Sequence, residues 1–314
     1  MMTALVFPGQ GSQKIGMALN MIKTFPWAAK MAQDADKLLN RNLTRVIFEG
    51  PEVELKETVN TQPALFLTEA ILADGYKKMG LGFDATAGHS LGEYSALYAA
   101  KAASFEDLLK LVDVRARAMS EAVPPGQGAM AAVLNFDQSV LEKICQEVSN
   151  IGICVLANLN CPGQIVISGA VEAVKKVGEL AKERGAKRVL PLEVSGPFHS
   201  PLMKPAREKL ASAISSITFF DSETDVYQNV DGNFSRKASV FKEKLLSQLT
   251  GSVQWELQIK NMCSNGVRTF MELGPGKALS GLIRKINPDV VIKQAEDPDT
   301  FNALIMSQSA NLTA

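Results

Sequence analysis

The chain has 314 residues, 46% of them hydrophobic, and its 33 basic side chains balance its 33 acidic side chains. A chain of this length and composition can bury a large core, and its charge balance gives no reason to expect nucleic acid or a membrane as a partner. The N-terminus leads directly into the apolar residues 4–7, without the pattern of a secretion signal. We therefore expect a globular cytoplasmic protein, or a mature organellar one, that is a monomer.

The first 125 residues alternate short apolar segments with longer segments of helical spacing. Helices are predicted over residues 27–40, 62–79 and 105–122. Alternation of this kind is typical of a parallel sheet covered by helices. At the other end of the chain, periodicity is lost within residues 286–314, and we expect the last several to be disordered.

A different pattern begins at residue 126. Strands are predicted over 129–134, 153–158, 164–168 and 188–194, and helices over 137–148 and 171–185, the first capped by Asp137. The β-α-β-β-α-β order is ferredoxin-like. We therefore predict a small ferredoxin-like domain, residues 126–195, inserted into a larger α/β domain formed by residues 1–125 and 196–314.

Ser90 lies in the sequence Gly88-His89-Ser90-Leu91-Gly92, between a predicted strand and a predicted helix. This spacing is typical of a nucleophile elbow, because the flanking glycines allow a sharp turn that exposes the serine hydroxyl. The chain has only two histidines. The side chain of His89 should project away from Ser90, so the general base is expected to be His199. A single histidine is more often structural, but the lack of alternatives favours this role.

The glycine-rich residues 7–13 follow the first predicted strand. Their spacing fits neither dinucleotide nor P-loop phosphate motifs. We expect the amides of Gln10 and Leu91 to form an oxyanion hole, as in hydrolases whose second donor comes from an earlier strand-to-helix loop. A plain tight turn is the alternative.

Arg115 stands one helical turn before Met119, on a predicted helix whose apolar side is partly buried. A buried arginine needs an anionic partner, and a substrate carboxylate could pair with it through two hydrogen bonds. The alternative is a solvated charge, which we expect for Arg117.

The four cysteines show no C-x-x-C spacing, and two histidines cannot complete a zinc site with them. We expect buried free thiols and no metal.

Seven motifs occur in an order that resembles malonyl-CoA:acyl carrier protein transacylases, and together they cover nearly the whole chain. They are Phe-Pro-Gly-Gln-Gly-Ser-Gln at 7–13, Gly-His-Ser-Leu-Gly-Glu at 88–93, Arg115 with Met119, Asn-Leu-Asn-x-Pro-Gly-Gln at 158–164, Gly-Pro-Phe-His-Ser at 196–200, Gln-Leu at 248–249 with Val-Gln-Trp at 253–255, and Glu-Leu-Gly-Pro-Gly-Lys at 272–277. Two positions depart from the commonest pattern, Ala116 for glycine and Ser252 for proline.

The resemblance implies a fold and a set of roles. The fold is an α/β-hydrolase-like large domain with an inserted ferredoxin-like small domain. The implied roles are nucleophile for Ser90, base for His199, oxyanion donors for Gln10 and Leu91, carboxylate binding for Arg115, further substrate contacts for Met119, Asn160 and Phe198, and orientation of the base by the backbone carbonyl of Gln248. Phe198 is also expected to crowd an α-methyl branch on the acyl group.

The implied reaction is ping-pong transfer of malonyl from malonyl-CoA to the phosphopantetheine thiol of acyl carrier protein, through a malonyl-serine ester and without a cofactor. Fatty-acid synthesis is the expected pathway, and polyketide synthesis uses the same acyl group. A basic patch for the acidic carrier is expected, with Lys187, Arg188, Lys277, Arg284 and Lys285 as candidates. An ordinary solvated charge is the alternative for each of them.

Two other classes of function stay open. A serine esterase or thioesterase would use the same groups with an acidic residue, for which Asp137 and Glu193 are candidates. A non-catalytic carrier-binding subunit would not need Ser90, His199 and Arg115.

Overall fold

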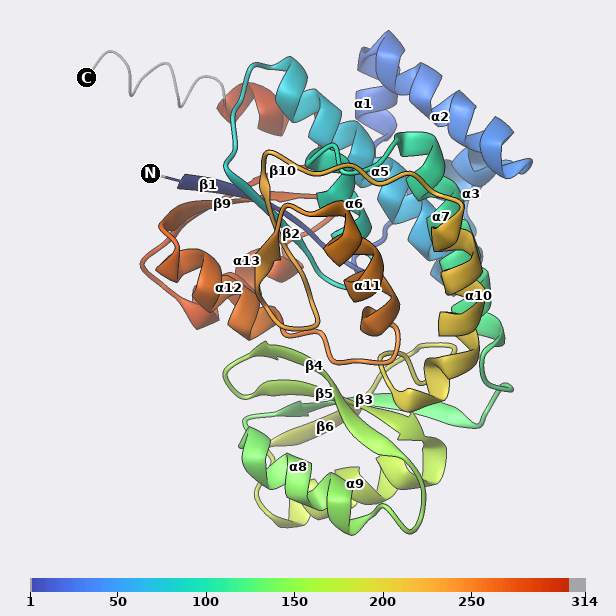
Figure 1. Cartoon of the computed structure of the whole chain (residues 1–314), viewed down its shortest axis with the longest axis vertical. Helices are drawn as coiled ribbons and strands as arrows, with labels where there is room; N and C mark the ends of the chain where they lie inside the picture. Colours follow the sequence, from blue (N-terminus) through green and yellow to red (C-terminus); the bar gives the residue numbers. More distant parts are fainter. Residues whose placement is uncertain (1, 305–314) are drawn as a thin grey trace.

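The computed structural model describes residues 2–304, which form two β-sheets with helices packed around them (Figure 1). The larger sheet has the order β10-β9-β1-β2-β7-β8. Its strands are β1 (Met2–Phe7), β2 (Ala85–Gly88), β7 (Asp225–Tyr227), β8 (Phe234–Ser235), β9 (Val267–Leu273) and β10 (Val291–Ala295). All neighbours in this sheet pair in parallel except β7 and β8, so the carboxyl ends of the central strands lie at one edge.

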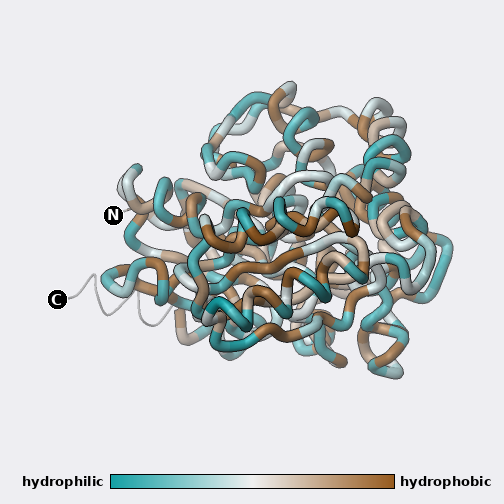
Figure 2. Tube along the Cα trace, turned by 90° about the horizontal axis from the view of Figure 1, so that it is seen from below, coloured by the Kyte–Doolittle hydropathy of each residue, from teal (hydrophilic) through white to brown (hydrophobic). Residues whose placement is uncertain are grey.

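Helices cover both faces of the larger sheet (Figure 1). They are α1 (Leu19–Thr24), α2 (Pro26–Leu39), α3 (Leu43–Glu49), α4 (Glu52–Lys56), α5 (Thr58–Lys78), α6 (Gly92–Ala99), α7 (Phe105–Glu121), α10 (Lys204–Ser215), α11 (Ala238–Gln248), α12 (Trp255–Ser264) and α13 (Ala278–Ile286), with a short 3-10 turn η1 (Pro201–Met203). Along the trace, helical segments alternate between hydrophobic and hydrophilic residues, which is typical of helices with one face on a core (Figure 2).

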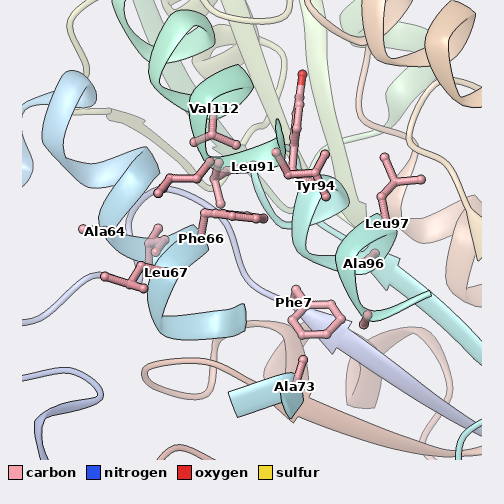
Figure 3. Packing of buried hydrophobic residues seen from close by; sticks show 14 of the residues in the cluster. Phe7, Ala64, Phe66, Leu67, Ala73, Leu91, Tyr94, Ala96, Leu97 and Val112 are labelled. Carbon is pink, nitrogen blue, oxygen red and sulfur yellow. The ribbon is translucent and has the colours of Figure 1, made fainter. Parts of the chain in front are cut away.

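Strand β1 supplies side chains to a hydrophobic cluster on each face of the sheet. Leu5 and Phe7 join the cluster of α5, α6 and α7, whereas Ala4 and Val6 join the cluster of α12 and α13. Successive side chains of a strand point to opposite faces, and a strand covered on both faces reads as a continuous apolar run. Figure 3 shows the first of these clusters, where side chains from β1 gather with those of α5, α6 and α7.

The second sheet is antiparallel and has the order β4-β5-β3-β6. Its elements follow one another as β3 (Gly128–Leu134), α8 (Gln138–Glu147), β4 (Cys154–Cys161), β5 (Gln164–Ala170), α9 (Val171–Glu183) and β6 (Arg188–Pro191). Helices α8 and α9 cover the face turned away from the larger sheet and enclose a hydrophobic cluster of their own (Figure 1). The predicted combination of a parallel α/β unit with a ferredoxin-like unit is confirmed, and the domain boundaries at 125/126 and 195/196 stay a prediction.

Most predicted element ends lie within two residues of the observed ends, but three differ by three or four residues. Strand β4 ends at Cys161, not at residue 158, because Leu159 and Cys161 still pair with β5. Helix α5 begins at Thr58, not at residue 62, although Pro63 lies inside it. Proline removes one backbone donor, and the carbonyl of Val59, one turn earlier, accepts a hydrogen bond of 2.8 Å from Arg41 Nη2 instead. Strand β6 ends at Pro191, not at residue 194, because a tight turn follows in which the amide of Val194 donates to the carbonyl of Leu192.

The remaining sequence expectations concern cysteines, membrane spans and the C-terminus. All four cysteines are free; Cys145, Cys154 and Cys161 are buried as predicted, whereas Cys263 is half-buried. Within residues 2–304, no helix is both long and apolar enough to cross a bilayer. The disorder predicted for the last residues falls on 305–314, which lie outside the described residues.

The glycines of the elbow allow three backbone segments to meet. A Cβ atom on Gly92 would lie 2.1 Å from the carbonyl oxygen of Phe7, and one on Gly88 would lie 1.8 Å from the carbonyl carbon of Gly92. No side chain fits at these distances. The backbones of β1, the end of β2 and the start of α6 can therefore pack this closely only because residues 88 and 92 are glycine.

We therefore expect Gly92→Ala to lower the free energy of unfolding by about 3 kcal/mol, the upper end for an overpacked core. The matched control is Gly281→Ala in α13, where an added Cβ would meet nothing within 4 Å. There the substitution should stabilise the helix by up to about 1 kcal/mol. Urea unfolding of both variants is the measurement, and equal stability of the two would contradict this account of the elbow.

Candidate active site

Ser90 stands at the turn between β2 and α6 with a φ of 53°. This left-handed conformation is costly for a residue with a side chain and persists only where the surroundings impose it. The backbone amide of Ser90 donates to Asn229 Oδ1 at 2.8 Å, and Asn229 Nδ2 donates to the carbonyl of Gly88 at 2.7 Å. Asn229 thus ties both sides of the turn and holds the serine in place.

His199 reaches Ser90 from the segment that follows the small sheet. Its Nε2 atom lies 2.7 Å from Ser90 Oγ, and its Nδ1 atom lies 2.9 Å from the carbonyl oxygen of Gln248. A carbonyl can only accept, so Nδ1 carries the proton and Nε2 presents its lone pair to the serine hydroxyl. The structure thus brings together the serine and the histidine that the sequence singled out and the carbonyl that the resemblance implies.

Burial keeps the imidazole of His199 neutral. Its side chain is almost inaccessible to water, and desolvation, reinforced by the nearby charge of Arg115, lowers the pKa of His199 to about 3. The histidine therefore stays unprotonated near neutral pH and can accept the serine proton.

Arg115 is fully buried and lies directly beside the serine. Its Nη2 atom donates to Ser90 Oγ at 3.0 Å and to Gln248 Oε1 at 2.9 Å, and its Nη1 atom donates to Gln62 Oε1 at 2.7 Å. The guanidinium also lies over the ring of Tyr94, 5.2 Å from its centroid. Within the described chain Arg115 forms no ion pair with an acidic side chain. A buried cation bonded only to neutral groups is suited to bind an anionic part of a ligand.

The amides of Gln10 and Leu91 have no backbone acceptor within residues 2–304. The loop of Gln10 is packed against the elbow, since a Cβ atom on Gly9 would lie 2.5 Å from the carbonyl oxygen of His89. The side chain of Gln10 turns to Thr58, to which its Nε2 atom donates at 3.0 Å. The two amides are therefore free to donate to an oxygen at the elbow.

Met119 shares a partner with the buried arginine, and Phe198 precedes the histidine His199 in the chain. Met119 Sδ accepts a 3.5 Å hydrogen bond from Gln62 Nε2, the same side chain whose carbonyl holds Arg115. A Cβ atom on Gly196 would lie 3.2 Å from the ring of Phe198 and 3.7 Å from the carbonyl oxygen of Met119. Both side chains are buried.

Asn160 lies on the other side of the elbow. Its Oδ1 atom is 2.9 Å from Nε2 of His89, whose ring packs near Trp255 at a centroid distance of 5.7 Å. His89 is therefore engaged with these groups, not with Ser90. Asn160 also lines a groove of about 420 Å³, together with the loop at residues 8–12 and Lys285.

Other sequence candidates lie outside this cluster. Asp137 caps α8, with its Oδ1 atom accepting from the amide of Val140 at 3.0 Å, and Glu193 is exposed, so neither orients His199. The basic candidates are all exposed and form no ion pair in the described chain: Lys187 and Arg188 on the small sheet, and Lys277, Arg284 and Lys285 at α13. Within residues 2–304, no group of three histidine, cysteine, aspartate or glutamate side chains could hold a metal ion.

Three residues of the cluster were not assigned a role from the sequence: Gln62, Glu93 and Asn229. Gln62 lies in a helix that is buried nearly all round, so no amphipathic pattern marks it. Asn229 follows β7, the strand beside β2, at the carboxyl edge of the sheet. A polar residue just after a buried parallel strand is the signal that could have identified it.

A serine in a strained backbone conformation, with its hydroxyl hydrogen-bonded to a neutral histidine and two free amides beside it, is the arrangement used by enzymes that transfer acyl groups through a serine. The comparisons with known proteins agree with this class. Residues 4–294 match the family described as acyl transferase domain, and the chain belongs to that family.

Three relatives show how close the likeness is. A malonyl CoA-acyl carrier protein transacylase of Bacillus subtilis is 47% identical over 305 residues, which cover 97% of this chain and 96% of the relative. A crystal structure of a protein of that name from Clostridium perfringens superposes with a TM-score of 0.95 at 36% identity, covering 100% of this chain and 99% of that one. A malonyl-transacylase in complex with a type II PKS acyl-carrier protein gives 0.95 at 37% identity, covering 98% and 100%.

The lowered pKa of His199 has a direct consequence for its titration. Because both burial and Arg115 disfavour the imidazolium, we expect the NMR resonances of the His199 ring to stay at neutral-imidazole positions from pH 8 down to pH 5. The signal can be assigned by its absence from the spectrum of His199→Asn. A titration midpoint near 6.5, the value of a solvated histidine, would contradict the desolvated site.

Proposed function

We propose that this protein transfers the malonyl group from malonyl-CoA to the phosphopantetheine thiol of acyl carrier protein, and so supplies extender units for fatty-acid synthesis. The observation that carries the proposal is the buried Arg115, whose Nη2 atom lies 3.0 Å from Ser90 Oγ without an acidic partner in the described chain. It supports an acyl group that ends in a carboxylate. The relatives named malonyl CoA-acyl carrier protein transacylase support the same donor and acceptor.

In the proposed first half-reaction, His199 Nε2 takes the proton of Ser90 as Oγ attacks the thioester carbon of malonyl-CoA. The carbonyl oxygen becomes an oxyanion held by the amides of Gln10 and Leu91. The carbon–sulfur bond then breaks, and His199 returns the proton to the sulfur of coenzyme A. A malonyl-Ser90 ester remains.

The second half-reaction reverses these steps with the carrier as nucleophile. His199 accepts the proton of the phosphopantetheine thiol and the sulfur attacks the carbonyl carbon of the serine ester. The bond between that carbon and Ser90 Oγ then breaks, and His199 returns the proton to Oγ. Because one thioester replaces another, the exchange requires neither a metal nor a redox cofactor. The carbonyl of Gln248, which accepts from His199 Nδ1, keeps the imidazole in the tautomer that both halves need.

Acyl selectivity follows from the groups around the serine. A malonyl carboxylate can accept from the Arg115 guanidinium, whereas an acetyl group leaves that buried cation without an anion. Phe198 stands next to His199 in the chain and is buried, and we expect it to crowd an α-methyl branch, so methylmalonyl-CoA is expected to be a poorer donor. Packing of this kind is worth roughly 1–3 kcal/mol.

Two neighbouring functions are kept as alternatives. Polyketide synthesis is supported by the likeness to a malonyl-transacylase bound to a type II PKS acyl-carrier protein. Hydrolysis of the serine ester would make the chain a thioesterase, and it differs from transfer only in the nucleophile of the second step. Cytoplasmic location and a monomeric state stay predictions.

The test compares Arg115→Ala with Arg117→Ala, a control two residues along the same helix. Arg117 is half exposed and pairs with Asp113. We expect Arg115→Ala to lower kcat/KM for malonyl-CoA by about 10² or more relative to acetyl-CoA, from the loss of a buried charged pair, and Arg117→Ala to leave the ratio unchanged. Acyl-carrier product and free acid are quantified by mass spectrometry.

Unchanged malonyl preference in Arg115→Ala would contradict the role of the arginine. Release of free malonate by the wild type in place of malonyl-carrier would contradict transfer and favour the thioesterase.

A further inference from the structure

We propose that Glu93 is the counter-charge of Arg115, and that its ionisation sets how strictly the site requires a carboxylate on the acyl group. The inference rests on the proposed malonyl transfer and adds a specificity-determining residue to it. Glu93 touches neither Ser90 Oγ nor the space beside Arg115 through any hydrogen bond of its own, so it would act through the arginine.

Glu93 lies in the first turn of α6 and is fully buried. Its Oε2 atom accepts from the backbone amide of Asn229 at 2.9 Å and from Gln248 Nε2 at 3.0 Å. Its Oε1 atom has no hydrogen-bond partner within the described residues. A carboxyl group buried with one oxygen unpaired is costly to ionise unless a positive charge lies near it.

That positive charge is Arg115, which is joined to Glu93 through one side chain. Gln248 Oε1 accepts from Arg115 Nη2 at 2.9 Å, while Gln248 Nε2 donates to Glu93 Oε2. The amide therefore turns its carbonyl to the cation and its N–H to the carboxyl group. A charge on Arg115 or on Glu93 strengthens its hydrogen bond to Gln248, so the Gln248 amide couples the two groups.

Arg115 is the charged group that faces Glu93 within the described chain. The loop after β7 presents Asn229 and Gln228, α11 presents the amide of Gln248, and the adjacent Tyr94 is neutral because burial raises its pKa to about 12. Burial raises the pKa of Glu93 to about 7, against the amide of Asn229, Gln248 and Arg115, which lower it. Glu93 can therefore change charge near neutral pH.

The two charge states of Glu93 favour different acyl groups. When Glu93 is ionised, it balances Arg115, so the site tolerates an acetyl group, and the malonyl carboxylate experiences repulsion. When Glu93 is neutral, Arg115 is unbalanced until a carboxylate arrives, and malonyl is favoured over acetyl. Selectivity for malonyl should therefore decrease as the pH rises through about 7.

A purely structural role would give a different result. Glu93 also stabilises the elbow through Asn229, and loss of that support would slow acylation by both donors alike. The ratio of kcat/KM for malonyl-CoA to kcat/KM for acetyl-CoA separates the two roles. Protonation of His199 affects both donors equally and cancels in this ratio.

The experiment measures this ratio from pH 6 to 8.5 for the wild type, Glu93→Gln and Glu69→Gln, with acyl carrier protein as acceptor. Glu69 is the matched control, since it is equally buried but accepts from Ser95 and not from a group of the site. We expect the ratio to be about tenfold higher in Glu93→Gln than in the wild type at pH 8, and to be independent of pH in that variant, as for removal of a charge that one amide group separates from the arginine. Glu69→Gln should keep the wild-type profile.

A wild-type ratio that is constant over this pH range would overturn the proposal, even if Glu93→Gln failed to fold. An unchanged ratio in a folded Glu93→Gln, or the same change in Glu69→Gln, would overturn it as well. In each of these cases the wild type would still form malonyl-carrier, so the proposed transfer would stand. Absence of malonyl-carrier with the wild type would instead overturn the proposed function and this inference with it.

Discussion

The site depends on one arrangement: the hydroxyl of Ser90 donates to a neutral histidine and accepts from a charged arginine. Both partners contact the same oxygen: the histidine is placed to accept its proton, and the arginine donates a hydrogen bond to it. Arginine is always protonated in proteins, so its charge persists while burial and that same charge keep His199 neutral. The fold buries the histidine and the arginine, leaves the serine half-buried, and supplies each of the three from a different segment of the chain.

Gln248, the last residue of α11, connects these segments. Its backbone carbonyl accepts from His199 Nδ1, and its side chain joins Arg115 to Glu93 and donates to the carbonyl of Ser90 at 3.0 Å. The orientation of the base and the position of the arginine therefore depend on one residue. Because Gln248 contacts both His199 and Glu93, the site contains a buried carboxyl group although no acidic side chain orients the histidine.

The sequence predicted those parts of the site that depend on local backbone geometry or on a residue type that is rare in the chain. Gly88 and Gly92 identify the elbow because no other residue fits the close approach of β1 and α6, and His199 follows from the presence of only two histidines. The three residues that it missed form hydrogen bonds to residues 53 to 155 positions away in the chain: Gln62, Glu93 and Asn229. The periodicity of a sequence does not indicate hydrogen bonds between such distant residues. The carbonyl of Gln248 was indicated by the family resemblance alone, since a sequence does not show where a backbone carbonyl points.

The central claim is that Ser90 carries the acyl group between two thiols. The most direct measurement is the intact mass of the enzyme after brief exposure to malonyl-CoA without carrier, with Ser90→Ala treated in the same way. The account predicts one added malonyl group on the wild type, located on the peptide that contains Ser90, discharged when reduced carrier is added, and missing from Ser90→Ala. An adduct of equal size on Ser90→Ala, or no adduct on either protein, would contradict it.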